Sequence, residues 1–194
     1  VEMPVPRSTD YRSRLRERFD RAGAISLADY ELLELVLFRA IPRRDVKPLA
    51  KALLAEFGDF AHVISAPSAR LKAVKGLGEA AAREFKVVEA AAHRLAQGRI
   101  MGREALMNWS ALMDYCMTAM SHREIEEFRV LVLYPKNVLI ADEPQARGTI
   151  DHVPVYPREG VKRALHLNAS ALILVHNHPS GDPTPSKSDI DMTL

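Results

Sequence analysis

The chain has 194 residues, a formal net charge of +2 and 47% hydrophobic residues, which is typical of a globular protein of one or two domains. It contains no apolar run of about eighteen residues, so the sequence predicts no membrane span. Its single cysteine, Cys116, excludes a disulfide framework and favours a cytoplasmic protein.

Charge is shared unevenly along the chain. Lys and Arg outnumber Asp and Glu in residues 1–100, and the reverse holds in residues 101–194. This asymmetry predicts two units with different partners. We expect residues 1–100 to form an all-helical domain and residues 101–194 to form an α/β domain.

Helical periodicity runs through the first half. Ser26 followed by Asp29 resembles a capping box, which predicts a helix that continues until Pro42. A second helix is expected to end at Gly58, a residue common at helix C-termini. The apolar positions of these two helices recur at helical spacing: Leu32, Leu33, Val36, Leu37, Leu49, Ala52, Leu53 and Phe57.

Residues 65–96 resemble a helix-hairpin-helix motif. Gly76 and Gly78 permit a tight turn, and backbone N–H groups at the start of the following helix can bind a phosphate. Lys72 and Lys75 would add positive charge there, so the motif predicts non-specific contact with DNA. The alternative is a pair of packed helices joined by glycines, which would serve as a spacer or as a protein-docking unit.

Strands begin in the second half. A helix over 106–119, in which Cys116 is a small core residue, is followed by strands at 128–134 and 138–142 around a Pro-Lys-Asn turn. A third strand is expected within 146–156, and a helix from Pro157 to Asn168. The apolar run 171–175 predicts the central strand of the sheet.

The stretch HNHPSGDPTPSKSD, residues 176–189, follows that strand directly. Because side chains two apart on a strand share a face, His176 and His178 can present two imidazoles to one point while Asn177 faces away. Proline and glycine then turn the chain, and a new helix carries Asp189 in its first turn. Two imidazoles and one carboxylate are the ligands of a catalytic Zn²⁺ site, where a fourth position stays open for water.

Other interpretations of this stretch exist. The histidines could lie on a surface turn, and the letters H-N-H suggest an HNH nuclease, although that nuclease pattern is dispersed over a longer unit. Asp182 and Asp191 are competing carboxylates. On a helix, positions 189 and 191 point about 200° apart, so only one of them can face a metal ion.

The spacing His-x-His, seven residues, Ser, two residues, Asp resembles the signature of the JAMM (JAB1/MPN) metallopeptidases, at His176, His178, Ser186 and Asp189. Together with GTIDHVPVYPRE at 148–159, it looks like the RadC branch, which is labelled as DNA-repair proteins. The resemblance implies a cytidine-deaminase-like sheet with flanking helices. It also implies zinc held by the two histidines and the aspartate, and Ser186 stabilising the substrate oxyanion. The family continues past the last ligand, so we expect this chain to be truncated at its C-terminus.

The family also requires an upstream glutamate as general base. Glu127 precedes the strand at 128–134 in the pattern Glu-x-x-x-Leu-x-Leu, which resembles the family's position. Glu124 and Glu126 are rivals, and strand alternation puts Glu126 and Glu127 on opposite faces. The alternative is a plain surface cluster of three glutamates.

Two functions follow. The first is a zinc metalloprotease that hydrolyses an amide or isopeptide bond of a peptide or protein substrate with water as nucleophile. The second is a DNA-associated module that uses the helical half, with a vestigial or structural metal site.

Overall fold

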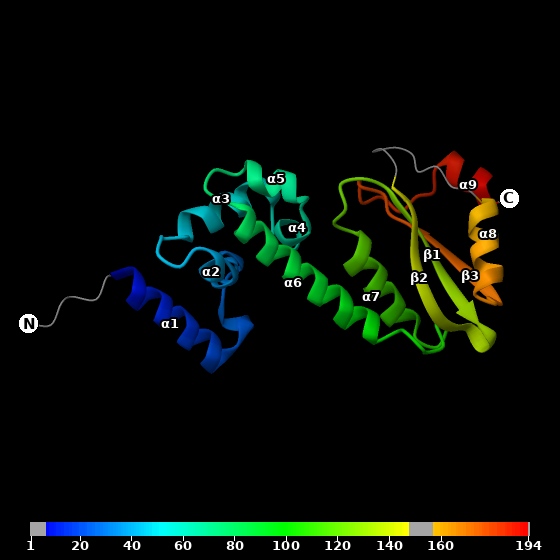
Figure 1. The fold of residues 1–194 in the computed structure, drawn as a ribbon, viewed down its shortest axis with the longest axis horizontal. Helices are drawn as coiled ribbons and strands as arrows, with labels where there is room; N and C mark the ends of the chain where they lie inside the picture. The colour runs from blue at the N-terminus through cyan, green and yellow to red at the C-terminus, as the bar shows by residue number, and fades with distance from the viewer. Residues whose placement is uncertain (1–6, 148–156, 194) are drawn as a thin grey trace, which may run out of the picture. The chain divides into compact units, whose positions relative to one another are not determined.

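The structure is a computed structural model that describes residues 7–147 and 157–193 (Figure 1). It divides into two compact units, Val1–Ala91 and Ala92–Leu194. Within the described residues, none of the helices combines the length and the apolar character that crossing a bilayer requires. The strand expected at 146–156 lies almost entirely outside the described residues.

The first unit is built from helices, as the sequence predicted. The described elements are α1 (Arg7–Ala22), a short 3-10 turn η1 (Ala24–Ser26), α2 (Asp29–Ala40), α3 (Lys47–Phe57), α4 (Phe60–Ser65), α5 (Ser68–Ala73) and α6 (Glu79–Gly98). The helix α6 continues past Ala91 into the second unit.

The start of α2 differs from the prediction. Ser26 lies in η1, where its hydroxyl donates to the carbonyl of Gly23 at 2.8 Å, and Ala28 is the N-cap of α2. The carboxylate of Glu31 accepts from the N–H of Ala28 at 3.0 Å, which is half of a capping box. The expected pairing of Ser26 with Asp29 was therefore wrong, because the turn at Gly23 moves the helix start two residues later.

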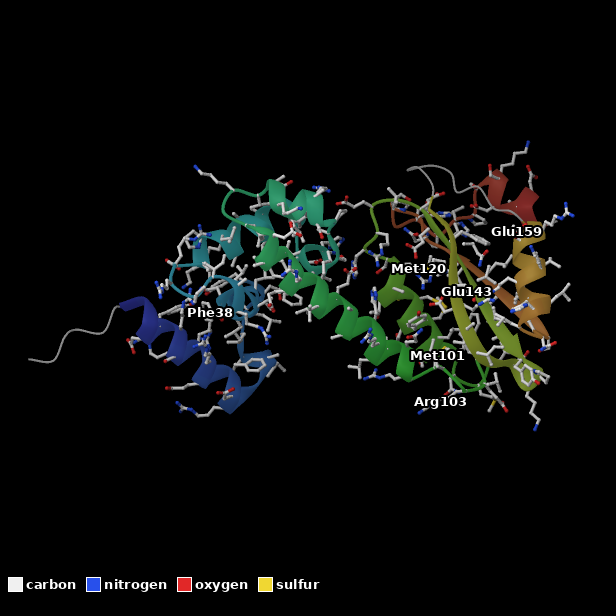
Figure 2. The ribbon with its side chains drawn as sticks, in the orientation of Figure 1. Phe38, Met101, Arg103, Met120, Glu143 and Glu159 are labelled. Carbon is white, nitrogen blue, oxygen red and sulfur yellow. The ribbon has the colours of Figure 1, made fainter. Side chains whose placement is uncertain are left out.

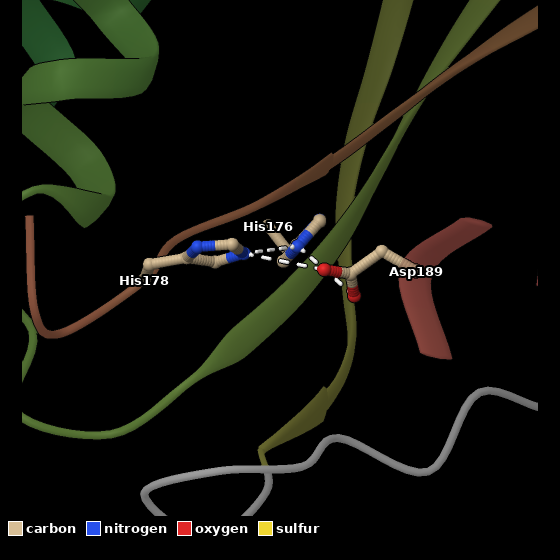
Figure 3. Close-up of side chains that lie close together, drawn as sticks. All are labelled: His176, His178 and Asp189. Carbon is tan, nitrogen blue, oxygen red and sulfur yellow. Dashed lines mark hydrogen bonds and ion pairs between the residues drawn. The ribbon is translucent and has the colours of Figure 1, made fainter. Parts of the chain in front are cut away.

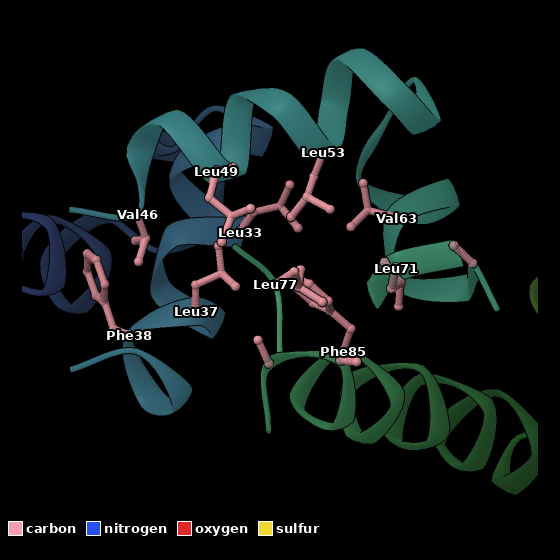
Figure 4. Packing of buried hydrophobic residues seen from close by; sticks show 14 of the residues in the cluster. Leu33, Leu37, Phe38, Val46, Leu49, Leu53, Val63, Leu71, Leu77 and Phe85 are labelled. Carbon is pink, nitrogen blue, oxygen red and sulfur yellow. The ribbon is translucent and has the colours of Figure 1, made fainter. Parts of the chain in front are cut away.

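The core of the first unit forms where the apolar faces of α2, α3, α5 and α6 meet (Figure 4). Leu33, Leu37, Leu53, Leu71 and Phe85 are fully buried in it. Burial of such side chains contributes roughly 1.5–3 kcal/mol each before the entropy of ordering is counted. The periodicity of the sequence therefore reflects one shared core.

The second unit combines helices with a small antiparallel sheet. Its described elements are α7 (Trp109–Met120), β1 (Glu127–Tyr134), a turn η2 (Pro135–Asn137), β2 (Val138–Arg147), α8 (Pro157–His166), β3 (Ala171–His176) and α9 (Lys187–Thr193). The sheet has the order β2-β1-β3. The predicted α/β class is confirmed, but the central strand among those described is β1, and β3 flanks it.

The two faces of β1, the middle strand of the sheet in Figure 1, contact different parts of the second unit. Leu131 and Leu133 join a cluster with Leu112 and Met120 of α7, and Met120 is labelled in Figure 2. The other face of β1 packs against the segment that follows α8 and against β3. Arg163 of α8 also donates to Glu143 of β2 at 2.6 Å. The antiparallel pairing of β1 with β3, from the pair Leu133 and Ala171 to the pair Phe128 and His176, holds the end of β3 in a fixed register.

Candidate metal centre

The end of β3 carries the first histidine. His176 pairs with Phe128 of β1 in the antiparallel register. Cross-strand partners project to the same face of a sheet, so His176 lies on the face of Phe128, opposite to α7. His178 follows two residues later, in the segment that turns toward α9.

His176, His178 and Asp189 converge on one point (Figure 3). The two Nε2 atoms lie 2.8 Å apart, and the Asp189 carboxylate oxygens lie 3.3 Å from Nε2 of His176 and 3.4 Å from Nε2 of His178. All three side chains are partly buried, with exposed fractions between 17% and 24%. In the described residues this is the one group of three metal-ligating side chains close enough to hold an ion.

The donor set fits a zinc ion. For tetrahedral zinc with ligand distances of 2.0–2.1 Å, two ligand atoms are about 3.3 Å apart. The two imidazole-to-carboxylate distances match this spacing, and the imidazole pair would have to separate by about 0.5 Å. Two neutral imidazole nitrogens that face each other repel unless a cation or a proton lies between them, which is what a metal site provides.

A backbone carbonyl orients the ring of His178. Its Nδ1 lies 2.7 Å from the carbonyl oxygen of Asp182, a geometry that places the proton on Nδ1 and leaves Nε2 as the metal-facing atom. The Asp182 carboxylate instead accepts from the N–H and the hydroxyl of Thr184, which lowers the Asp182 pKa. Asp182 therefore supports a ligand, and Asp191 is exposed and outside the group.

Ser186 and Asp189 cap the start of α9 reciprocally. The N–H of Ser186 donates to Asp189 Oδ2 at 2.7 Å, and the N–H of Asp189 donates to Ser186 Oγ at 3.2 Å. Burial tends to raise the pKa of Asp189, but the hydrogen bonds with Ser186 and the electrostatic interaction with His176 lower it below its usual value. The carboxylate is thus held ionised, in the form that binds a metal.

Asn177 is a site residue that the sequence reasoning did not assign. It is 8% exposed, its Oδ1 accepts from the N–H of Glu127 at 2.9 Å, and its Nδ2 donates to the carbonyl of Ile125 at 3.2 Å. The predicted alternation, with Asn177 facing away from the histidines, is the signal that could have found it.

Glu127 is buried at 2% exposure on the opposite face of β1 from His176. Its carboxylate accepts from Arg129 at 2.5 Å. Arg129 also donates to both carboxylate oxygens of Asp142, which in turn accepts from the Tyr115 hydroxyl. Burial alone would lower the pKa of Arg129, but Asp142 outweighs it and raises that pKa. The structure therefore does not bring Glu127 into the cluster of metal-ligating side chains.

Glu126 stands one residue before β1 and is half-buried. If the alternation of β1 is extended by one residue, position 126 lies on the face of Phe128 and His176. On this extension, position 126 shares a face with the candidate metal ligands and position 127 does not.

The residues predicted to contact DNA lie in the other unit. The turn between α5 and α6 has Gly76 at φ 96°, a conformation that favours glycine. Lys72 donates to Glu79 at 2.9 Å, and Arg44 donates to the Gly76 carbonyl at 2.7 Å. Lys75 and Gly78 lie on the same turn. Arg44 is a cation on this turn that the sequence reasoning missed, because it is 32 residues away along the chain.

In a comparison with known proteins, each of the two units matches a protein family. Residues 106–194 match the family described as RadC-like JAB domain, and residues 7–83 match the family described as UPF0758 N-terminal. The chain belongs to the UPF0758 family. A UPF0758 protein of Ruegeria pomeroyi is 68% identical over 184 residues, covering 95% of this chain and 82% of the relative. A UPF0758 protein of Rhodobacter capsulatus is also 68% identical, over 92% of this chain and 84% of the relative. Neither name states a reaction.

Proposed function

We propose that this UPF0758 protein is a zinc-dependent hydrolase of amide or isopeptide bonds. The observation that carries the proposal is the convergence of His176 at the end of β3, His178 in the segment that follows, and Asp189 in α9. The match to the RadC-like JAB domain family supports the same conclusion. In such a site, zinc would polarise the scissile carbonyl and lower the pKa of water to about 7.

Side chains of the protein would stabilise the oxyanion and transfer the proton. Ser186 accepts from the Asp189 N–H, so its hydroxyl hydrogen can still be donated to a developing oxyanion. A carboxylate must also take a proton from the attacking water and return it to the leaving amine. We assign this role to Glu126 in place of Glu127, because the Glu127 carboxylate is bound to Arg129 on the opposite face of β1.

Metal content tests the site. We expect about one zinc per chain in the wild type and loss of zinc in His178→Ala and in Asp189→Ala. Asp191→Ala is the matched control, since it removes an exposed carboxylate from the same helix and should retain zinc. A folded wild type without zinc, or equal loss of zinc in the control, would contradict the proposal.

A hydrolysis assay tests which glutamate is the general base. The probe is a mixture of tryptic peptides, in which mass spectrometry detects newly formed amino termini. We expect Glu126→Gln to retain zinc and to lose at least 100-fold in rate. If Glu127→Gln abolishes hydrolysis while Glu126→Gln does not, the base is Glu127.

We also propose a second function, non-specific DNA binding by the α5–α6 turn. The observation that favours it is Arg44, whose guanidinium lies on the turn with most of its donors uncommitted to any described residue. The pairing of Lys72 with Glu79 opposes it, since an acidic side chain at the start of α6 repels phosphate.

Fluorescence anisotropy with a labelled DNA duplex of about 20 base pairs tests this second function. We expect binding that weakens steeply with salt, and we expect Arg44→Ala and Lys75→Gln each to reduce the salt slope by about one. Lys162→Gln on the exposed surface of α8 is the control. No binding at low salt would exclude the DNA function without affecting the zinc site.

A further inference from the structure

We propose that Asn177 is a positioning residue that ties the metal-binding histidines to the segment Ile125–Glu127. This inference rests on the proposed hydrolase function, because its consequence is the placement of the base relative to the metal ligands. Nothing in the JAMM spacing itself specifies the residue between the two histidines.

The connection is made at the point where the strand ladder ends. The pairing of β1 with β3 stops at Phe128 and His176. One residue beyond it, the Asn177 side chain replaces the ladder by accepting from the Glu127 N–H at 2.9 Å and donating to the Ile125 carbonyl at 3.2 Å. A single side chain thus satisfies a donor and an acceptor of the opposite backbone segment.

The side chain of Glu127 also holds the segment in place. The Glu127 carboxylate accepts from Arg129, and Arg129 is held by two hydrogen bonds to Asp142. Glu127 is therefore anchored through both its backbone and its side chain, and the carboxylates of Glu127 and Asp142 are almost entirely buried. Because Glu127 is held in place, the position of the adjacent residue Glu126 is restricted as well.

The chemistry of the side chain is specific. Asparagine offers one acceptor and one donor at a fixed separation, which matches an N–H and a carbonyl two residues apart. Aspartate has nearly the same shape and keeps the acceptor, but it places a carboxylate oxygen against the Ile125 carbonyl. Alanine removes both bonds and leaves two backbone groups without partners near the site.

The experiment compares Asn177→Ala and Asn177→Asp with Ser170→Ala. Ser170 is the matched control, because its hydroxyl donates to the Leu133 carbonyl at 3.2 Å at the far end of the same strand pair. Hydrogen exchange of the Glu127 amide is measured without metal. Cobalt(II) titration, followed by its visible absorption, reports the geometry and affinity of the ligands.

We expect Asn177→Ala to speed exchange at Glu127 at least tenfold and to weaken cobalt binding by about 10–100-fold. Asn177→Asp should keep the Glu127 amide protected yet lower kcat at least tenfold on the tryptic-peptide probe with little change in KM, because the hydrogen bond to the Ile125 carbonyl is replaced by repulsion between two oxygens. Ser170→Ala should change none of these quantities.

Equal effects in Asn177→Ala and Ser170→Ala would overturn the proposal, because they would show a general contribution to strand pairing. Unchanged cobalt affinity in Asn177→Ala would also overturn it. If the wild type binds no cobalt, the hydrolase function fails, and amide exchange at Glu127 alone then decides whether Asn177 holds the segment.

Discussion

The helical unit and the sheet unit each bury carboxylates, and they stabilise them differently. In the helical unit, Glu34 is fully buried, and one of its oxygens accepts from the Tyr11 hydroxyl at 3.0 Å. Its other oxygen has no hydrogen-bond partner in the described part of the chain. In the sheet unit, Glu127 and Asp142 share the guanidinium of Arg129.

The difference shows what a buried charge can contribute to a fold. A carboxylate paired with a guanidinium through several hydrogen bonds is held in one geometry, as expected of a support beneath a functional site. A carboxylate with one oxygen that lacks a hydrogen-bond partner carries a desolvation cost, and its side chain is held less firmly in one geometry. The paired carboxylates belong to the unit that carries the candidate metal centre, and the other one belongs to a core without such a centre among its described residues.

The largest effect is expected where the shared cation is removed. Arg129→Met should destabilise the protein by roughly 3–5 kcal/mol, because it removes the buried cation that pairs with both Glu127 and Asp142. Urea denaturation measures the change in the free energy of unfolding. Arg39→Met is the control, because Arg39 pairs with Glu84 while 76% exposed, and it should cost less than about 1 kcal/mol. Similar costs for the two variants would remove the contrast between the units.

A smaller effect of opposite sign is expected at Glu34. Glu34→Gln should stabilise the protein by about 1 kcal/mol at pH 8, because it removes a buried charge while its carbonyl still accepts from Tyr11. Thermal unfolding at that pH gives the comparison. A lower melting temperature in the variant would contradict this expectation.

The pH dependence of the free energy of unfolding tests the same account of Glu34. Burial raises the pKa of Glu34 above its usual value of 4.5, so the native state holds this proton more tightly than the unfolded state does. The contribution of Glu34 to stability is therefore fully present below pH 4.5 and is lost as the pH rises through the native pKa. The advantage of Glu34→Gln should shrink as the pH falls toward 4.5, as measured by urea denaturation from pH 4.5 to 8. An advantage independent of pH would contradict this account.

The smallest effect is expected at the exposed pair of Lys72 and Glu79. Lys72 lowers the pKa of Glu79, but both side chains are well exposed, so solvent screens their attraction. We expect Lys72→Gln to leave the urea midpoint unchanged within error. A clear loss of stability would mean that this pair, like the Arg129 network, has a structural role.

Local patterns in the sequence predicted much of the fold. Period-3.6 apolar spacing identified α2 and α3, and the branched apolar runs identified β1 and β3, because these patterns depend only on neighbours along the chain. The start of α2 was missed, since the turn at Gly23 and the bond from Ala28 to Glu31 compete with the apparent cap at Ser26.

The sequence by itself determined the residue types and spacing of His176, His178 and Asp189, and hence the metal chemistry that we propose. Tertiary structure decided which groups stand beside them. The register of β1 against β3 directs Glu127 away from His176, and Arg129 and Asp142 hold it there. Asn177 reaches Ile125 and Glu127 across 50 or more residues of sequence. Such contacts depend on strand register and burial, which no local pattern encodes.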